Sequence, residues 1–379
     1  MRSSAVGLGL VISLGAVVGC GFHSPPAQGD DTPGDGAPGT GACTTFASQV
    51  DTCKLAFGDD LTLSGTITYD TGTHELKVNG TAMPVGHMTL TTRAGTLDAI
   101  FARNVRLTMG ALLKAAGTLP FGIIASGSVT LEDASQIDLG NGGAGALAVC
   151  SNPPTAGGSS SGGGAGGGGG GFGGAGGDGS NGDSDGNGSV GGVKSNSIGM
   201  PIGPYGGCPG AAGGAGVLPG GAGGLGGGAL YIAAAGRIDL GINAALTAGG
   251  GGGHGGPQSG DAGGGGGGSG GMIVLDAPHV IGPQGRVAAN GGGGGEGSNT
   301  AQLGRDGDPG ASSALRASGG GGSAADGTDG GRGGSMEEPT GETVTMQLKA
   351  GGGGGGGGVG YIHIVSADRQ LGSVSPAAQ

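Results

Sequence analysis

Asp183, Asp185 and Asn187 have the residue types and the alternate spacing of a calcium-binding loop. Such a loop takes oxygen ligands from its first, third and fifth positions and has glycine at the sixth, which is Gly188 here. Its twelfth position needs a bidentate glutamate, and Lys194 stands there instead. The sequence therefore excludes an EF-hand. Two interpretations remain: these three residues bind calcium, or the chain has no cofactor.

No constellation for nucleophilic catalysis stands out in the sequence. The pattern Gly-x-Ser-x-Gly occurs around Ser269, but it lacks the strand, turn and helix that present the nucleophile in that motif. Four arginines recur at similar strand positions, where we expect their stems to cover apolar surface: Arg106, Arg237, Arg286 and Arg316. The histidines are dispersed, and none stands beside a plausible Ser or Cys nucleophile: His23, His74, His87, His254, His279 and His363. We predict that the chain is not an enzyme.

Four cysteines beyond residue 40 predict two disulfides, since an even number in an exported chain favours pairing. Three connectivities are possible, and proximity in the sequence favours Cys43 with Cys53 and Cys150 with Cys208. The second bridge would tie together the ends of a glycine-rich excursion. Zinc is the rival interpretation, but the sequence has no Cys-x-x-Cys pair and no clustered histidines to support it.

The composition is far from that of an ordinary globular domain. Of 379 residues, 109 are glycine, and only 3% are aromatic. Glycine has no side chain to bury and loses much backbone freedom on folding, so the glycine runs are either mobile or ordered by main-chain hydrogen bonds. The net charge of -12 repels phosphate groups and excludes nucleic acid as a partner.

The N-terminus has the features of an export signal. Arg2 precedes an apolar stretch over residues 6–18, too short to span a bilayer and typical of a signal peptide. Residues 17–20, Val-Val-Gly-Cys, resemble the bacterial lipobox. That resemblance implies removal of residues 1–19, acylation of Cys20 and a lipid anchor in the membrane, and Gly21 then favours the outer membrane. Residues 20–42 are rich in Pro, Gly and Asp and predict a disordered linker.

The rest of the chain alternates short strand patterns with glycine runs. Residues 43–126 predict a strand-rich part, with a hairpin over residues 61–79. Val105 and Val129 begin similar strands 24 residues apart, and residues 127–140 and 228–241 both end in Ile-Asp-Leu-Gly. We predict an all-β fold, a β-solenoid of parallel β-helix-like coils, with residues 127–379 as its glycine-rich repeat region. Further single strands are expected at residues 314–318 and 344–350.

The long glycine runs follow the closing strands of these units, so we expect them to emerge on one face of the solenoid and to lie side by side. Two states are open. The runs are mobile loops, or they are extended polyglycine II helices with three residues per turn that hydrogen-bond to one another.

The whole chain resembles glycine-rich lipoproteins of Gram-negative soil bacteria, and its glycine tracts resemble the repeats of PGRS-type surface proteins. The resemblance rests on the lipobox and on phrases such as Ala-Ala-Asn-Gly-Gly at residues 288–292. It implies an outer-membrane lipoprotein at the cell surface, or on the periplasmic face, with a structural or adhesive role. Its partners would be the membrane and the polysaccharide or surface of other cells. The alternatives are a β-helix protein that binds or degrades polysaccharide, and ice or mineral binding by threonines such as those of residues 89–92.

Overall fold

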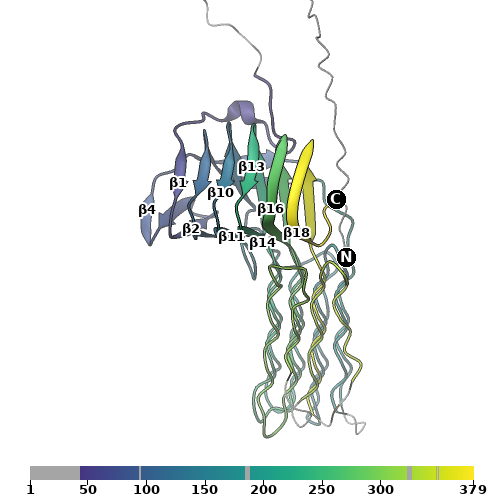
Figure 1. Ribbon diagram of the computed structural model, residues 1–379. Helices are drawn as coiled ribbons and strands as arrows, with labels where there is room; N and C mark the ends of the chain where they lie inside the picture. Colours follow the sequence, from purple (N-terminus) through teal and green to yellow (C-terminus); the bar gives the residue numbers. More distant parts are fainter. Residues whose placement is uncertain (1–42, 94, 184–187, 322–326, 347, 349) are drawn as a thin grey trace, which may run out of the picture. The chain divides into compact units, whose positions relative to one another are not determined.

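The computed structural model describes residues 43–93, 95–183, 188–321, 327–346, 348 and 350–379, and the compact unit that they form runs from Cys43 to Gln379 (Figure 1). Apart from the short 3-10 helix η1 (Thr52–Lys54), the regular structure of these residues consists of strands. None of the described helices is long and apolar enough to cross a membrane. The predicted signal peptide and linker lie outside the described residues.

A large sheet contains 12 strands. Eleven follow one hydrogen-bonded order, and β18 (Asp368–Ser375) pairs with β16 beside them. The order is β1 (Leu61–Leu63), β7 (Val105–Leu107), β10 (Val129–Leu131), β13 (Arg237–Leu240), β16 (His279–Ala288), β14 (Ala245–Thr247), β11 (Gln136–Asp138), β8 (Leu112–Ala116), β2 (Thr66–Asp70), β3 (Glu75–Val78) and β4 (Thr81–Met83). The long β16 joins the two halves of this sheet, because its first residues pair with β13 and its last with β14.

A small sheet contains the other six strands, in the order β17 (Tyr361–Val365), β15 (Met272–Asp276), β12 (Ala229–Ala234), β9 (Phe121–Ala125), β6 (Gly95–Ala102) and β5 (His87–Thr92). Every residue of β9, β12 and β15 is buried. Such continuous apolar runs are expected of strands covered on both faces. The strands of the large sheet alternate instead, as in Ile67 and Tyr69 of β2, which are buried between exposed neighbours.

Two apolar clusters account for this burial. The first combines side chains of both sheets, including Leu113, Ile123 and Ile232. The second lies on the other face of the small sheet and includes Tyr231 together with apolar residues of the segment that precedes β1. That segment, with η1, therefore covers a face of the small sheet that would otherwise expose apolar side chains to water.

The prediction of an all-β solenoid with parallel β-helix-like coils is wrong. The strands form two mixed sheets that do not close, and antiparallel pairs join β2 with β3, β3 with β4, and β5 with β6. The cause lies in tight turns that reverse the chain. Asp70 accepts hydrogen bonds from the backbone of Gly72 and Thr73, and His74 and Asn79 adopt left-handed φ angles of 59° and 50°.

Strand pairing does not follow the similarity of the sequence segments, and two predicted single strands do not form. The matching Ile-Asp-Leu-Gly phrases do not pair with each other: Val129 lies opposite Ile238, and Ile137 lies opposite Leu246. The strand β13, which contains most of the second phrase, therefore pairs with β10 and not with β11, which contains the start of the first. Residues 314–318 form no strand, and neither do the described residues of 344–350, because their backbone hydrogen bonds go to glycine-rich segments or side chains instead.

Three long glycine-rich excursions leave the large sheet after β11, β14 and β16 and return at β12, β15 and β17 of the small sheet. They cover residues 139–228, 248–271 and 289–360, and Figure 1 shows them running together beyond one end of the strands. Of the two states that the sequence leaves open, the structure has the hydrogen-bonded one. Residues 263–271, 291–298 and 351–358 are buried throughout.

Successive N–H groups of the glycine runs donate to different neighbouring segments, and the same segment accepts again three residues later. In residues 351–359, N–H groups three residues apart donate to the same neighbouring segment, except that Gly353 donates to the hydroxyl of Ser180. Gly351, Gly354 and Gly357 donate to the carbonyls of Ser298, Gly295 and Gly292, in that order. Gly352, Gly355 and Gly358 donate to Gly164, Gly167 and Gly170. Gly356 donates to Glu342 and Val359 to Pro339. A backbone that turns by one third of a circle at each residue produces this pattern. Main-chain carbonyls thereby satisfy the buried N–H groups of this run apart from that of Gly353.

Glycine is required inside this bundle because neighbouring main chains approach so closely. A Cβ at Gly354 would overlap the carbonyl oxygen of Gly265, and a Cβ at Gly166 would overlap that of Gly353. No side chain could move aside to relieve either overlap, since the obstructing atoms belong to backbone.

Candidate functional site

The structure contains both favoured disulfides, Cys43–Cys53 and Cys150–Cys208. The second joins positions 58 residues apart and links the two arms of the first glycine-rich excursion. Its Cys208 is buried, and the Cys208 N–H donates to the hydroxyl of Ser269 at 2.7 Å. The predicted lipid anchor, Cys20, lies outside the described residues.

Of the candidate calcium ligands, only Asp183 lies within the described residues. Asp183 has a left-handed φ of 34°, and its N–H donates to the carbonyl of Ala350 at 2.9 Å. Asp185 and Asn187 lie outside the described residues. Ser269 is fully buried with its hydroxyl bonded to the backbone of Cys208, so this serine serves the packing of the bundle.

Three of the arginines that recur along the strands make polar contacts. Arg106 forms an ion pair with Glu132, and Arg237 pairs with Asp239 at 2.6 Å. Arg316 donates from Nε to the carbonyl of Gly333 at 2.8 Å. The hydrogen bond from Arg106 lowers the pKa of the Glu132 carboxyl, and a second hydrogen bond from the Met109 backbone N–H lowers it further. The contacts of Arg106 and Arg316 join neighbouring segments, whereas the Arg237–Asp239 pair lies within β13.

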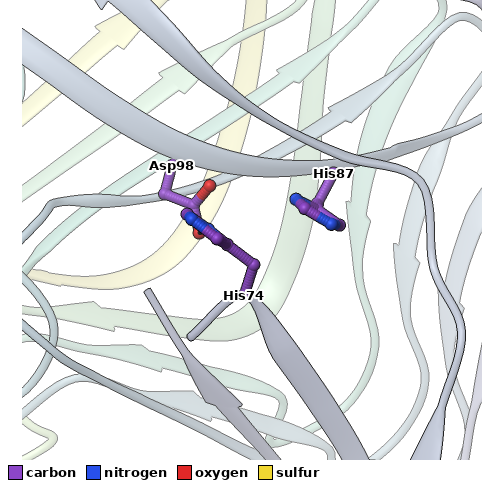
Figure 2. A group of neighbouring side chains, drawn as sticks. All are labelled: His74, His87 and Asp98. Carbon is purple, nitrogen blue, oxygen red and sulfur yellow. The ribbon is translucent and has the colours of Figure 1, made fainter. Parts of the chain in front are cut away.

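The structure brings His74, His87 and Asp98 together, three residues that the sequence does not single out as a group (Figure 2). Each offers one atom able to bind a metal, and these atoms all lie within 4.8 Å of one another. The His74 and His87 rings stack with their centroids 5.0 Å apart and their planes inclined by 7°. Asp98 is completely buried, His74 is partly buried, and His87 is exposed.

Different elements position the three side chains. His74 occupies the turn between β2 and β3, where its N–H donates to the carbonyl of Asp70 at 2.7 Å. His87 begins β5, and Asp98 lies on the adjacent β6, opposite Thr89. The cluster therefore spans the two sheets. Its members are 13 and 11 residues apart along the chain. Compact metal motifs have shorter spacings, so no local pattern in the sequence marks these three residues as a group.

Tyr69 is hydrogen-bonded to the buried carboxylate of Asp98. Its hydroxyl donates to Asp98 Oδ2 at 2.7 Å, and burial followed by this hydrogen bond raises the Tyr69 pKa well above its usual range. The phenol therefore remains a donor at neutral pH. His74 Nδ1 lies 3.0 Å from the same Oδ2 but outside hydrogen-bond geometry, and Asp98 Oδ1 has no hydrogen-bond partner among the described residues.

A pocket of about 600 Å³ opens beside the two histidines. Its remaining walls come from the β2–β3 turn, from β3 and β4, and from the chain between β4 and β5: Thr73, Glu75, Leu76, Ala82, Met83, Pro84 and Val85. Two imidazoles, a carboxylate and an adjoining pocket can bind a metal ion together with a small exchangeable ligand.

A second hollow, a groove of about 910 Å³, follows polar side chains on neighbouring strands of the large sheet. Thr68 lies opposite Lys114, Lys114 opposite Asp138, and Asp138 opposite Thr247. The groove carboxylates are already engaged. Asp138 accepts from the Thr247 hydroxyl at 2.7 Å, Glu75 pairs with Lys77 at 2.8 Å, and Asp70 caps its turn. This polar row suits hydrogen bonding to a hydroxyl-rich ligand.

The comparisons with known proteins add no relative from which a site could be transferred. No protein-family model matches the chain, and neither a curated protein nor a solved structure matches it.

Proposed function

We propose that this chain is a structural or adhesion protein of the bacterial cell surface that works without catalysis. The observation that supports this role is the threefold rotation of hydrogen bonds among the glycine runs. A bundle whose buried N–H groups bond to several neighbouring segments resists bending and local opening, as an extended surface element must. Its exposed apolar side chains, such as Val217 and Leu303, are available for weak repeated contacts.

The proposal includes the predicted export route. Residues 1–19 direct export, Cys20 carries the lipid in the outer membrane, and residues 20–42 separate the anchor from the folded unit. The two disulfides are in keeping with an oxidising compartment. The surface-facing orientation is the one we propose, and the periplasmic face is the alternative.

Fractionation of cells that express the full chain tests the anchor. We expect the wild-type chain in the outer-membrane fraction with incorporated radiolabelled fatty acid, and the Cys20→Ser variant without label and outside that fraction. Ser24→Ala, four residues further on, is the matched control and should behave as wild type. Equal labelling of Cys20→Ser and wild type would exclude Cys20 as the anchor. Protease treatment of intact cells then separates the two orientations, because only a surface-facing chain is digested.

Attachment of cells to other cells or to coated surfaces tests the role of the bundle. Gly354→Val places a side chain against backbone inside the bundle, whereas Gly199→Ala adds a methyl group where nothing lies within 4 Å. At equal amounts on the surface, we expect Gly354→Val to lose attachment and Gly199→Ala to keep it. Unchanged attachment by Gly354→Val would argue against a structural role for the bundle.

Polysaccharide binding is a second candidate function, and the polar row in the 910 Å³ groove favours it. Retardation of the purified chain in gels that contain acidic or neutral polysaccharides tests this function. Lys114→Ala in the groove should abolish retardation, and Lys54→Ala, which removes an exposed lysine beside Asp51 outside the groove, should not. Equal mobility of wild type in gels with and without polysaccharide would rule the groove out.

A further inference from the structure

We propose that His74, His87 and Asp98 bind one divalent transition-metal ion, and that Tyr69 positions Asp98 for this role. The three side chains come from a turn and two strands that the fold holds in place. The site is distinct from the calcium candidate of the acidic loop, and it does not depend on the proposed surface function.

The buried carboxylate of Asp98 favours a cation beside it. The residue is completely buried, and a buried carboxylate is costly unless hydrogen bonds or a cation compensate it. Tyr69 supplies one hydrogen bond, to Oδ2, and Oδ1 has no hydrogen-bond partner among the described residues. A metal ion at this carboxylate would supply the missing compensation.

Asp276 is a buried carboxylate with more hydrogen-bond donors than Asp98 in the same molecule. It is also buried and also accepts a hydrogen bond from a tyrosine, Tyr231, at 2.7 Å. Ser48 adds two more donors to its Oδ2, the backbone N–H at 2.6 Å and the hydroxyl at 2.7 Å. Asp98 has no such serine donors, and instead one ring nitrogen each of His74 and His87 lies within 4.8 Å of a carboxylate oxygen.

The geometry of the ligand atoms also suits a single metal ion. Two ligands on one Zn²⁺, each about 2.0–2.2 Å from the ion, are at most about 4.4 Å apart. The three candidate atoms lie within 4.8 Å of one another, and His74 Nδ1 is 3.0 Å from Asp98 Oδ2. A shift of a few tenths of an ångström by the exposed His87 would complete the set. In Figure 2, one ring nitrogen of His87 faces the other two side chains.

The donor types select the class of metal. Two imidazole nitrogens and one carboxylate oxygen suit Zn²⁺, Cu²⁺, Ni²⁺ or Fe²⁺, whereas Ca²⁺ and Mg²⁺ prefer oxygen ligands alone. Three protein ligands leave at least one coordination position, and the 600 Å³ pocket gives a small ligand or water access to the histidine side of the cluster. Tyr69 orients the carboxylate as outer-shell groups do in metal sites.

Two other histidine–aspartate pairs provide matched controls. His254 Nδ1 lies 3.2 Å from Asp306, and His279 Nδ1 lies 3.3 Å from Asp368. All four of these side chains are about half exposed or more, and neither pair belongs to a three-ligand group within the described part of the chain. Substitutions at these two histidines therefore test whether any surface histidine beside a carboxylate contributes to metal binding.

The experiment is calorimetric titration of the full chain, purified without a histidine tag and treated with chelator, with Zn²⁺ alone. We expect one ion per chain for wild type and at least about tenfold weaker binding for His87→Asn and His74→Asn. Asparagine is chosen at position 74 because it tolerates the left-handed backbone found there. His254→Asn and His279→Asn should bind as wild type does.

Further readouts keep the test decisive. Circular dichroism and the thermal midpoint of the metal-free His87→Asn protein should equal those of wild type, since His87 is exposed. Electron paramagnetic resonance with Cu²⁺ should show coupling to two nitrogens in wild type and to one in His87→Asn. Tyr69→Phe should weaken Zn²⁺ binding about 10–100-fold, and Tyr231→Phe should leave it unchanged.

The absence of saturable Zn²⁺ and Cu²⁺ binding by the wild-type chain would overturn the proposal. So would equal binding by wild type and His87→Asn. If His254→Asn or His279→Asn weakened binding as strongly as His87→Asn, the metal would be held by scattered surface histidines, and the proposed site would be wrong.

Discussion

Tyr231 donates a hydrogen bond of 2.7 Å to Asp276, and Tyr69 donates one of the same length to Asp98. Both carboxylates are buried, yet they differ in their other neighbours. Asp276 receives two further hydrogen bonds from Ser48, whereas Asp98 faces the ring of His74. At Asp276 the tyrosine–aspartate contact is part of a hydrogen-bond network with Ser48. At Asp98 the same contact leaves the carboxylate facing a histidine that could share a metal ion with it.

The difference predicts unequal effects of removing the two hydroxyls. Tyr69→Phe should lower the free energy of unfolding by about 2–3 kcal/mol, because Asp98 then loses its hydrogen-bond donor. Tyr231→Phe should lower it by about 1 kcal/mol, since Ser48 still compensates Asp276. Urea denaturation in the presence of a chelator measures both values. A larger loss in Tyr231→Phe would show that Ser48 contributes little to Asp276.

The close packing of the glycine runs predicts that a single methyl group destabilises the bundle. Gly354→Ala should lower the free energy of unfolding by about 1–3 kcal/mol, because the added Cβ overlaps the carbonyl of Gly265. Gly199→Ala should change it by less than about 0.5 kcal/mol, since nothing lies within 4 Å of the added atom. Scanning calorimetry compares the two. Equal midpoints would contradict the tight packing, and slowed exchange of the glycine amides should confirm their hydrogen bonds independently.

The two disulfides should contribute unequally to stability. On the chain-entropy model, a bridge across 58 residues stabilises the fold by about 4 kcal/mol, and one across 10 residues by about 3 kcal/mol. The double serine variant of Cys150 and Cys208 should therefore have the lower denaturation midpoint. The matching variant of Cys43 and Cys53 is its control. The reverse order would show that strain or residual structure outweighs loop length.

The buried tyrosines predict a loss of stability at high pH. Burial raises the pKa of Tyr69 and Tyr231, so the folded chain holds these protons more tightly than the unfolded chain does. Their contribution is complete below the unfolded pKa of about 10 and is lost as the pH rises above it. Ultraviolet absorbance of phenolate should rise together with the loss of circular dichroism. Ionisation of both residues before unfolding would contradict their burial.

Local features of the chain could be predicted from the sequence. The β2–β3 hairpin pairs within residues 61–79, where a hairpin is expected, and both disulfides join the cysteines nearest in the sequence. The alternation of strands with glycine runs was equally readable. Turn residues, alternating apolar positions and short cysteine separations act over few residues, so they leave a signal in the sequence itself.

Pairing between distant strands required the tertiary structure. Ile137 and Ile238 occupy identical phrases, yet they pair with Leu246 and Val129, because register follows the burial of whole strands and not the similarity of four residues. The same holds for the mixed sheets that replace the predicted solenoid, in which antiparallel hairpins sit beside parallel crossovers.

The sequence by itself determined an acidic, glycine-rich chain with two disulfides and strands between its glycine runs. Only the tertiary structure decided that these runs bond to one another in a threefold pattern, and that His74, His87 and Asp98 meet. Both outcomes depend on contacts between residues far apart in the chain. Glycine carries no side chain to reveal its neighbours, and dispersed ligands reveal a site only when the sheets bring them together.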